Sequence, residues 1–202
     1  TSVLIKADGQ DRMWRSIPVA FDQAIPVKAP RRASPEEWAA VKEARKKHNL
    51  SRLAAEALAR LRQAVDALPN GADRLIIDAV DGSFANRTFL RALPARTVAV
   101  ARLRKNAALR AYLPPDQRQG TRKYGAPLPT PEAYLHDPSI PWQHLDVFVA
   151  QKQRRLTFKV IPNVCWPKAT ADRPLRLIVI KPAGYRLRKG SKLLYRQPAF
   201  LI

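Results

Sequence analysis

A single carboxylate lies where this chain could carry out chemistry. Residues 74–80 form an apolar run, interrupted by Asp78, that predicts a buried β-strand, and Asp81 follows directly at its end. In open α/β sheets, functional groups gather where loops leave the carboxyl ends of strands. A carboxylate there can hold Mg²⁺, which binds carboxylate oxygen together with water and substrate phosphate. Asp81 is therefore the candidate catalytic and metal-binding residue, suited to an in-line phosphodiester displacement.

Two other interpretations of these acidic residues stay open. The sequence Asp81-Gly82-Ser83 is also typical of a turn or a helix cap, in which a side-chain oxygen accepts a backbone N–H. Asp78 is a competing acid within the predicted strand. Side chains three positions apart in a strand point to opposite faces, so we expect Asp78 and Asp81 not to bind one ion together.

The charge of the chain is concentrated after this point. From Asp81 to Ile202 there are 23 Lys and Arg against 6 Asp and Glu, a net charge of +17, whereas residues 1–80 have 14 against 10, or +4; the two sum to the total of +21. Dispersed cations favour a phosphate polymer as partner, so nucleic acid is the expected partner. The alternative is a basic surface that is only solvated. No apolar run approaches the roughly 20 residues that span a bilayer, and no signal peptide opens the chain, so we expect a cytoplasmic protein without a membrane partner.

Basic residues interleaved with tyrosine form the candidate DNA-binding surface, because cations can neutralise phosphates while rings stack on exposed bases. The first group follows the predicted strand 97–103, the second lies in an irregular basic segment, and the third lies in the predicted loop 181–192. The candidates are Arg102, Arg104 and Lys105; Arg122, Lys123 and Tyr124; and Arg186, Arg188, Lys189 and Lys192.

Other common kinds of site find little support. The single cysteine, Cys165, excludes a disulfide framework and a cysteine-based metal cluster, and it reads as a small buried hydrophobic residue. The three histidines lack the spacing of zinc ligands. With only seven glycines, no phosphate-binding glycine loop is recognisable.

The helices and strands expected around these residues are those of an α/β protein. A helix is expected over 35–47, where Ser34, Pro35 and Glu37 form a capping box with proline at the first helical position. A second helix continues to about residue 68. Its apolar stripe is predicted to be core, with Arg52, Glu56, Arg60 and Arg62 largely outside it. The stripe consists of Leu53, Ala57, Leu58, Leu61, Val65 and Leu68.

The remaining elements complete the pattern of a sheet with helices. A short helix is expected over 83–93, and residues 104–141 are rich in Pro and Arg and are predicted to be irregular. Strands are predicted over 3–7, 13–21, 74–80, 97–103, 142–150, 154–164, 175–181 and from 193 onward, with a hairpin turn at 151–153.

The order of motifs resembles a known family. Residues 81–90 (DGSFANRTFL), followed by Leu93-Pro94, are similar to the second-aspartate block of DDE transposases of bacterial insertion sequences, and more closely to the DDE superfamily endonucleases. Further pieces follow in the same order: 102–107 (RLRKNA), 122–125 (RKYG), 141–142 (PW), 173–180 (RPLRLIVI), 185–186 (YR) and 194–199 (LYRQPA). Residues 17–21 (IPVAF) and the pair of predicted helices also fit upstream, so the ordered set covers about 180 residues.

The resemblance implies a ribonuclease H-like mixed sheet flanked by helices, present in part, with a basic β-rich insertion. Residues 1–103 would be the partial catalytic core and 104–202 the insertion, re-entering the core at its C-terminal end. It implies metal-dependent DNA strand cleavage and transfer at transposon ends, with Mg²⁺ or Mn²⁺, by an intact protein that could act as a homodimer.

Only the second of the family's three acids maps onto this sequence, at Asp81. The first aspartate is expected before Thr1 and the glutamate beyond Ile202, so the chain is predicted to be a central fragment that is inactive alone. The alternative, from a different class, is a non-enzymatic basic scaffold that binds nucleic acid, with Asp81 acting as a capping residue.

Overall fold

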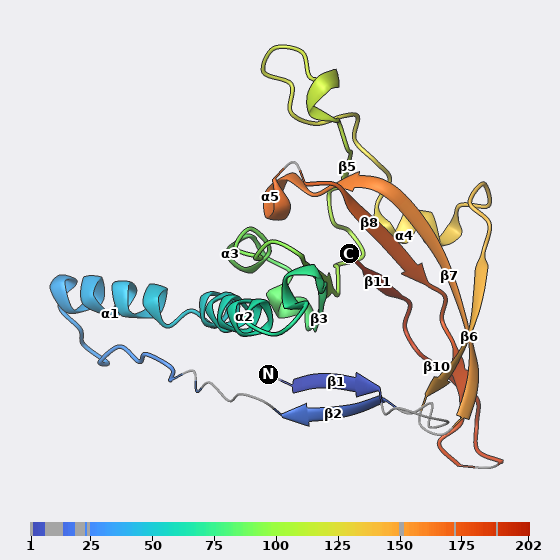
Figure 1. Cartoon of the computed structure of the whole chain (residues 1–202), viewed down its shortest axis with the longest axis horizontal. Coiled ribbons are helices and arrows are strands. Elements are labelled where there is room, and N and C mark those ends of the chain that lie inside the picture. Colours follow the sequence, from blue (N-terminus) through green and yellow to red (C-terminus); the bar gives the residue numbers. More distant parts are fainter. Residues whose placement is uncertain are drawn as a thin grey trace. The chain divides into compact units, whose positions relative to one another are not determined.

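The structure, a computed structural model, is a mixed α/β protein, which confirms the predicted class (Figure 1). It describes residues 2–6, 14–18, 23, 25–149, 152–171, 173–188 and 190–202. The chain divides into two compact units. Unit 1 comprises Thr1–Arg74 with Leu93–Ala95, and unit 2 comprises Leu75–Ala92 with Arg96–Ile202. The predicted boundary between residues 103 and 104 falls inside unit 2 and stays a prediction.

Unit 1 begins with an antiparallel strand pair. Strand β1 (Ser2–Lys6) pairs with β2 (Trp14–Pro18), in a register that joins Ser2 to Pro18 and Lys6 to Trp14. Both predicted strands are therefore confirmed, while their predicted ends at residues 7, 13 and 19–21 lie outside the described residues.

Helix α1 (Pro35–Lys47) begins at the predicted capping box. The backbone N–H of Glu37 donates to Ser34 Oγ at 3.2 Å, and the backbone N–H of Ser34 donates to Glu37 Oε2 at 2.7 Å. These two reciprocal bonds satisfy donors that the first helical turn leaves without partners.

Helix α2 (Leu50–Asp66) starts at Asn49, whose side chain accepts the backbone N–H groups of Ser51 and Arg52. Of its predicted apolar stripe, Leu58 is buried, and four further members are half-buried: Leu53, Ala57, Leu61 and Val65. Leu68 is 52% exposed, so its assignment to the core is wrong. It lies beyond the last helical turn, where the helical spacing no longer directs it to the packed face.

Arg62 was expected outside the packed face of α2, and this expectation is also wrong, because Arg62 is only 4% exposed. Its Nη1 donates to the carbonyl of Arg74 and its Nη2 to the carbonyl of Gly71, both at 2.7 Å. Nη2 also forms an ion pair with Asp66, one turn further along the helix. The guanidinium thus holds the chain that leaves α2, including the 3-10 helix η1 (Gly71–Asp73).

Replacing Arg62 by methionine is expected to destabilise unit 1 by about 2 kcal/mol, because two carbonyls lose a charged donor. The loss is limited by Asp66, which is partly exposed and can be solvated. Urea unfolding followed by circular dichroism measures the change. Gln63→Met, at the exposed neighbouring position of the same helix, is the control; equal stability of the two variants would contradict the role given to Arg62.

Unit 2 is built on β-strands (Figure 1). Strands β3 (Ile76–Val80) and β4 (Thr97–Ala101) form a parallel pair. A five-stranded antiparallel sheet contains β11, β8, β7 and β5 in that order, and β6 also pairs with β7. Its strands are β5 (Arg110–Ala111), β6 (Gln143–Val149), β7 (Lys152–Cys165), β8 (Leu175–Ile180) and β11 (Ala199–Leu201); the short β9 (Gly184–Tyr185) and β10 (Leu194–Tyr195) form a separate antiparallel pair.

The two sheets are joined by backbone hydrogen bonds between the ends of β4 and β11. Ala101 and Ile202 exchange two N–H···O bonds of 2.8 and 2.9 Å, and the N–H of Leu103 donates to the carbonyl of Phe200 at 2.7 Å. Arg102 pairs with Leu201 in an antiparallel bridge. The strands therefore lie side by side in the order β3, β4, β11, β8, β7 and β6. The pair β3 and β4 is parallel, and the other neighbours are antiparallel.

The strand β3 was expected to be covered on both faces. Asp78 and its neighbours two residues away are half-buried, but Ile77 on the other face is 69% exposed, and Val98, its partner in the register, is 46% exposed. In the described residues β3 pairs only with β4, so the prediction of a fully covered strand is wrong.

The helices of unit 2 are short. The predicted helix 83–93 is divided into the 3-10 helix η2 (Gly82–Phe84) and α3 (Arg87–Leu90), because Asn86 is extended and caps α3 by accepting the N–H of Phe89. The predicted irregular segment 104–141 contains the 3-10 helix η3 (Pro115–Gln117) and α4 (Pro131–His136), and α5 (Pro167–Thr170) follows β7.

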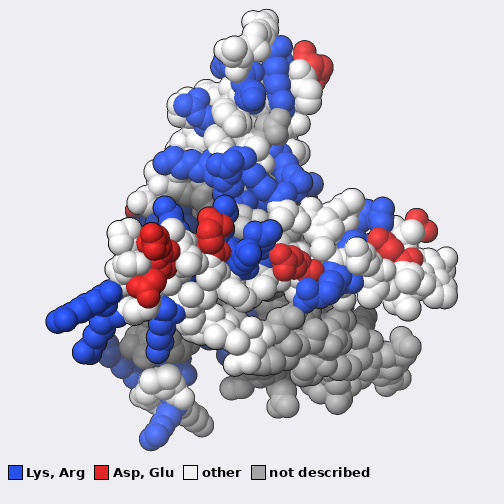
Figure 2. Space-filling view, turned by 90° about the vertical axis from the view of Figure 1, so that its left-hand side faces the viewer, with Lys and Arg blue, Asp and Glu red and all other residues white. Residues whose placement is uncertain are grey.

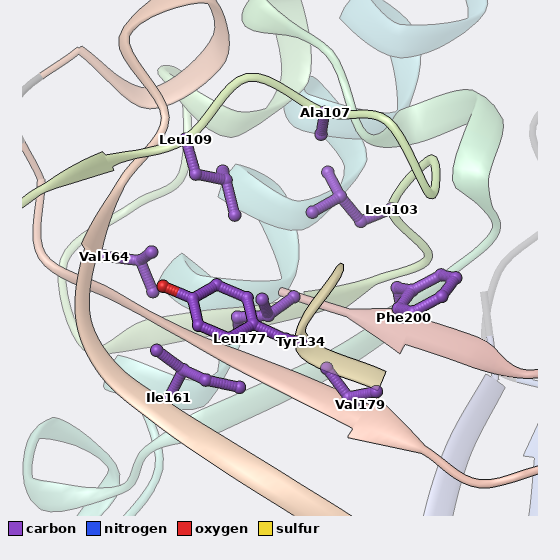
Figure 3. Packing of buried hydrophobic residues seen from close by; sticks show 9 residues of the cluster. All are labelled: Leu103, Ala107, Leu109, Tyr134, Ile161, Val164, Leu177, Val179 and Phe200. Atoms are coloured by element: carbon purple, nitrogen blue, oxygen red, sulfur yellow. The ribbon is translucent and has the colours of Figure 1, made fainter. Parts of the chain in front are cut away.

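The core of unit 2 lies between one face of the five-stranded sheet and two segments that pack on it, residues 103–109 and helix α4 (Figure 3). Leu177 and Val179 of β8 and Ile161 of β7 point toward Tyr134 of α4 and toward the residues that follow β4. The cluster consists of Leu103, Ala107, Leu109, Tyr134, Ile161, Val164, Leu177, Val179 and Phe200. Burial of this cluster fixes the sheet and the segment 103–109 as one body.

Candidate functional site

The carboxyl ends of β3 and β4 place Asp81 beside a cationic segment. Val80 and Ala101 are register partners in the parallel pair, so Asp81 and Arg102 leave the same edge of the sheet. This is the edge at which ligands bind in open α/β sheets. The sequence predicted both residues as site residues, and the structure brings them together.

The loop after β3 lies close to the end of β4 because residue 82 is glycine. A Cβ atom at Gly82 would lie 3.2 Å from the carbonyl oxygen of Arg102, closer than ordinary van der Waals contact. Gly82 also donates its N–H to Asp81 Oδ1, and Phe84 donates its N–H to the Asp81 carbonyl at 2.9 Å. Asp81 therefore caps η2 and is exposed.

Asp81 lines an open cleft of about 590 Å³ in unit 2. The other walls come from the segment that follows β4 and from the residues that lead into β11. The lining residues are Asp81, Gly82, Ser83, Arg102, Leu103, Arg104, Lys105, Asn106, Gln197, Pro198 and Phe200. The cleft thus combines one carboxylate with three of the predicted DNA-binding cations.

The three cations of the cleft are not equivalent. Arg102 and Arg104 are exposed at its surface. Lys105 Nζ forms an ion pair of 2.9 Å with Glu132 Oε1 of α4, and both side chains are largely exposed. An exposed pair of this kind contributes little to stability, so Lys105 can exchange Glu132 for a phosphate at small cost.

Asp81 is the acidic residue that fits a divalent cation in this cleft, but it supplies only one ligand. Across the described parts of the chain, no three His, Cys, Asp or Glu side chains come together as a metal site. A hard cation such as Mg²⁺ needs about six oxygen ligands. Asp81 can therefore hold such an ion only together with water, phosphate and ligands from elsewhere.

Asp78, the competing acid, does not line this cleft. It is half-buried on β3, and loss of solvation raises the pKa of its carboxyl group above the ordinary value. Burial disfavours the charged form that a metal ligand requires. The geometry thus favours Asp81 over Asp78 as the candidate ligand.

The second predicted cluster lies on a projecting segment, residues 112–125, which we call the arm (Figure 1). Hydrogen bonds at its base join Ala111 to Ala126 and Gly125 to Ala111. A Cβ at Gly125 would lie 2.9 Å from Ala111, so glycine permits this close approach. Arg122 and Lys123 are exposed on the arm, and Tyr124 is half-buried. Figure 2 shows that Lys and Arg side chains gather where the arm projects, with few acidic side chains among them.

The third predicted cluster lies on the hairpin of β9 and β10. Arg186, Arg188 and Lys192 are exposed there, and Lys189 lies outside the described residues. The structure therefore brings Arg102, Arg104 and Lys105 to Asp81 and places the other two clusters elsewhere on unit 2. Gln197, which lines the cleft, was missed, because its approach depends on the pairing of β11 with the end of β4.

Unit 1 carries a second depression, of about 480 Å³, lined by Pro35, Trp38, Ala39, Lys42 and Arg45 of α1. Arg45 lies over the Trp38 ring at 5.8 Å from its centroid. No acidic side chain lines this depression, so among the described residues it offers no ligand for a divalent cation.

Comparison of the chain with protein-family models, with curated proteins and with solved structures finds no match in any of the three. In the part of the chain that the structure describes, no helix has both the length and the apolar character needed to cross a membrane.

Proposed function

We propose that this chain is the central part of the catalytic domain of a DDE-type DNA transposase, which cleaves and transfers DNA strands at transposon ends. Asp81 is the second of its three metal-binding acids. One observation carries the proposal: Asp81 leaves the carboxyl end of a parallel strand and lines a cleft whose other charged side chains are all cations. A cleft with this composition suits a divalent ion that acts on a polyanion.

The residues of the cleft would divide two tasks. Arg102, Arg104 and Lys105 neutralise phosphates and hold the DNA backbone along the edge of the sheet. The Asp81 carboxylate, oriented by the N–H of Gly82, supplies one oxygen ligand to Mg²⁺ or Mn²⁺. When bound, the ion would activate the attacking water or hydroxyl group and stabilise the leaving oxygen.

The proposed fold of the intact domain is a ribonuclease H-like core with a basic β-rich insertion. The joining of β4 to β11 supports it, because residues 104–198 follow β4 and the chain then returns to pair with the end of the same strand. The resemblance requires two further acids, and the proposal assigns them to parts of the intact protein outside residues 1–202. On this proposal the chain alone does not cleave DNA, and the intact protein works in the cytoplasm, where it could form a homodimer on DNA.

A second function, a non-enzymatic scaffold that binds nucleic acid, is favoured by one contact. The Asp81 side chain accepts the N–H of Gly82 at the start of η2, which is the task of a capping residue. In this alternative the cations bind nucleic acid, and Asp81 has no ligand.

Metal-dependent cleavage by the full-length protein that contains this chain separates the two functions. The substrate is a supercoiled plasmid that carries the DNA found on both sides of the gene, and a plasmid with scrambled flanks is the control. We expect strand cleavage in Mg²⁺ or Mn²⁺ and none in EDTA. Metal-independent binding of both plasmids without any cleavage would overturn the transposase proposal in favour of the scaffold.

A further inference from the structure

The hairpin of residues 184–195, which we call the basic hairpin, has a feature that cleavage chemistry does not use. Its strands pair Tyr185 with Leu194 and Gly184 with Tyr195, and it lies at the lower end of the sheet in Figure 1. Arg196 lies over the Tyr185 ring, 5.6 Å from the centroid, at the base of the hairpin.

The loop of the basic hairpin is closed by Ser191. The guanidinium of Arg186 donates to the Ser191 carbonyl, and the N–H of Arg188 donates to Ser191 Oγ at 3.1 Å. Ser191 Oγ donates in turn to the Arg188 carbonyl at 2.8 Å. Gly190 has φ of +81°, a backbone conformation that glycine adopts without strain. The loop is thus held by several local contacts.

Leu187 projects from this closed loop between two arginines. It is 75% exposed, more than any other large hydrophobic residue in the described part of the chain. The exposed side chain of Arg188 follows it directly, and Arg186 precedes it. An aliphatic side chain held outside the core, with a cation on each side, is suited to a partner that offers both an apolar contact and negative charge.

The charge around the basic hairpin identifies that partner. The stretch from Arg173 to Ile202 contains eight Lys and Arg (173, 176, 181, 186, 188, 189, 192 and 196) and no Asp or Glu. A polyanion is therefore favoured along the whole stretch. Duplex DNA offers phosphates on both sides of the minor groove and the faces of stacked base pairs between them.

We propose that Leu187 is a wedge that enters the minor groove and inserts between two base pairs, while Arg186 and Arg188 contact the flanking phosphates. Aliphatic side chains inserted in this way partly unstack a base step and bend the duplex. The contacts with Ser191 hold Arg186 and Arg188, the two neighbours of Leu187, which lowers the conformational entropy lost when Leu187 binds. This inference adds DNA deformation to the proposed function and does not depend on Asp81.

DNA bending by the 202-residue chain tests the wedge. Duplexes of A·T-rich sequence carry a dye at each end, and others carry 2-aminopurine at successive steps. The wild-type chain is expected to shorten the distance between the dyes and to raise the 2-aminopurine fluorescence. Leu187→Ala is expected to abolish both signals and to weaken binding by only about threefold, since the lost apolar contact is offset by the avoided unstacking.

Three further variants separate the wedge from the charge. Leu187→Met keeps an apolar side chain of similar length and is expected to restore bending. Arg188→Ala is expected to reduce the slope of log affinity against log salt concentration by about 1, whereas Leu187→Ala leaves this slope unchanged. Leu145→Ala, at a 51% exposed position on β6 between His144 and Asp146, is the matched control and is expected to bend DNA like the wild type.

Two outcomes would overturn the wedge. If Leu187→Ala bends and unstacks DNA as the wild type does, Leu187 does not insert between base pairs. If instead the variant loses binding to vesicles that contain anionic phospholipid while its DNA signals are unchanged, Leu187 serves a membrane surface. Either result leaves the cleavage assay of the full-length protein unaffected, so a failure of the wedge is distinguishable from a failure of the transposase proposal.

Discussion

The full-length protein carrying Asp81→Asn is expected to cleave its DNA about a thousandfold more slowly in Mg²⁺ than the wild type. This ratio corresponds to about 4 kcal/mol, within the several kcal/mol that a metal ion supplies to a transition state. The asparagine oxygen can still accept the N–H of Gly82, so the cap of η2 is kept while the charged ligand is lost. Single-turnover cleavage of the plasmid with natural flanks measures the ratio.

Two further substitutions make this result specific to Asp81. Asp116→Asn, on the exposed part of the arm, makes the same change of charge away from the cleft and is expected to cleave at the wild-type rate. Asp81→Ala removes both the ligand and the cap and is expected to lose about 1 kcal/mol of stability as well. Cleavage by Asp81→Asn at the wild-type rate, together with a less stable Asp81→Ala, would make Asp81 a capping residue only.

Replacing Lys159 by methionine is expected to lower the free energy of unfolding of unit 2 by about 3 kcal/mol. Lys159 is 1% exposed, and its Nζ donates to the carbonyls of Tyr134 and Asp137 at the end of α4. Nζ also lies 4.4 Å from the centroid of the Trp142 ring. Methionine keeps an apolar chain of similar length but leaves two carbonyls without a donor, and the cation–π contact is lost. Urea unfolding measures the change.

Lys181→Met is the matched control, because Lys181 lies over the same ring. Its Nζ is 5.5 Å from the Trp142 centroid, but the residue is exposed. We expect a loss of about 0.5 kcal/mol, which is typical of an exposed cation–π contact. Equal losses for the two variants would show that the buried hydrogen bonds of Lys159 contribute nothing.

Elements with strong local signals could be predicted from the sequence. The capping box at Ser34 and Glu37 fixes the start of α1, because both partners lie within one helical turn. The apolar run before Asp81 predicts β3, and the parallel register of β3 with β4 then places Asp81 beside Arg102. The part of the candidate site that lies at the ends of strands could therefore be predicted from the sequence.

Features that depend on distant partners could not be predicted. Arg62 and Lys159 are two of 37 Lys and Arg residues, and no local pattern distinguishes them from the exposed ones. Both can be buried because carbonyl oxygens at the end of a helix, or just after it, accept hydrogen bonds from them. The approach of Gln197 to the cleft likewise requires the pairing of Arg102 with Leu201, which are far apart in the sequence.

The bonds between β4 and β11 also have a consequence for biosynthesis. About a hundred residues separate the two strands, so the ribosome must make and release the whole intervening chain before Ala101 and Ile202 can meet. Until then the end of β4 is an open strand edge, which can pair with another nascent chain. Contacts of such long sequence separation slow folding, so this strand edge stays open for longer while the chain is being made.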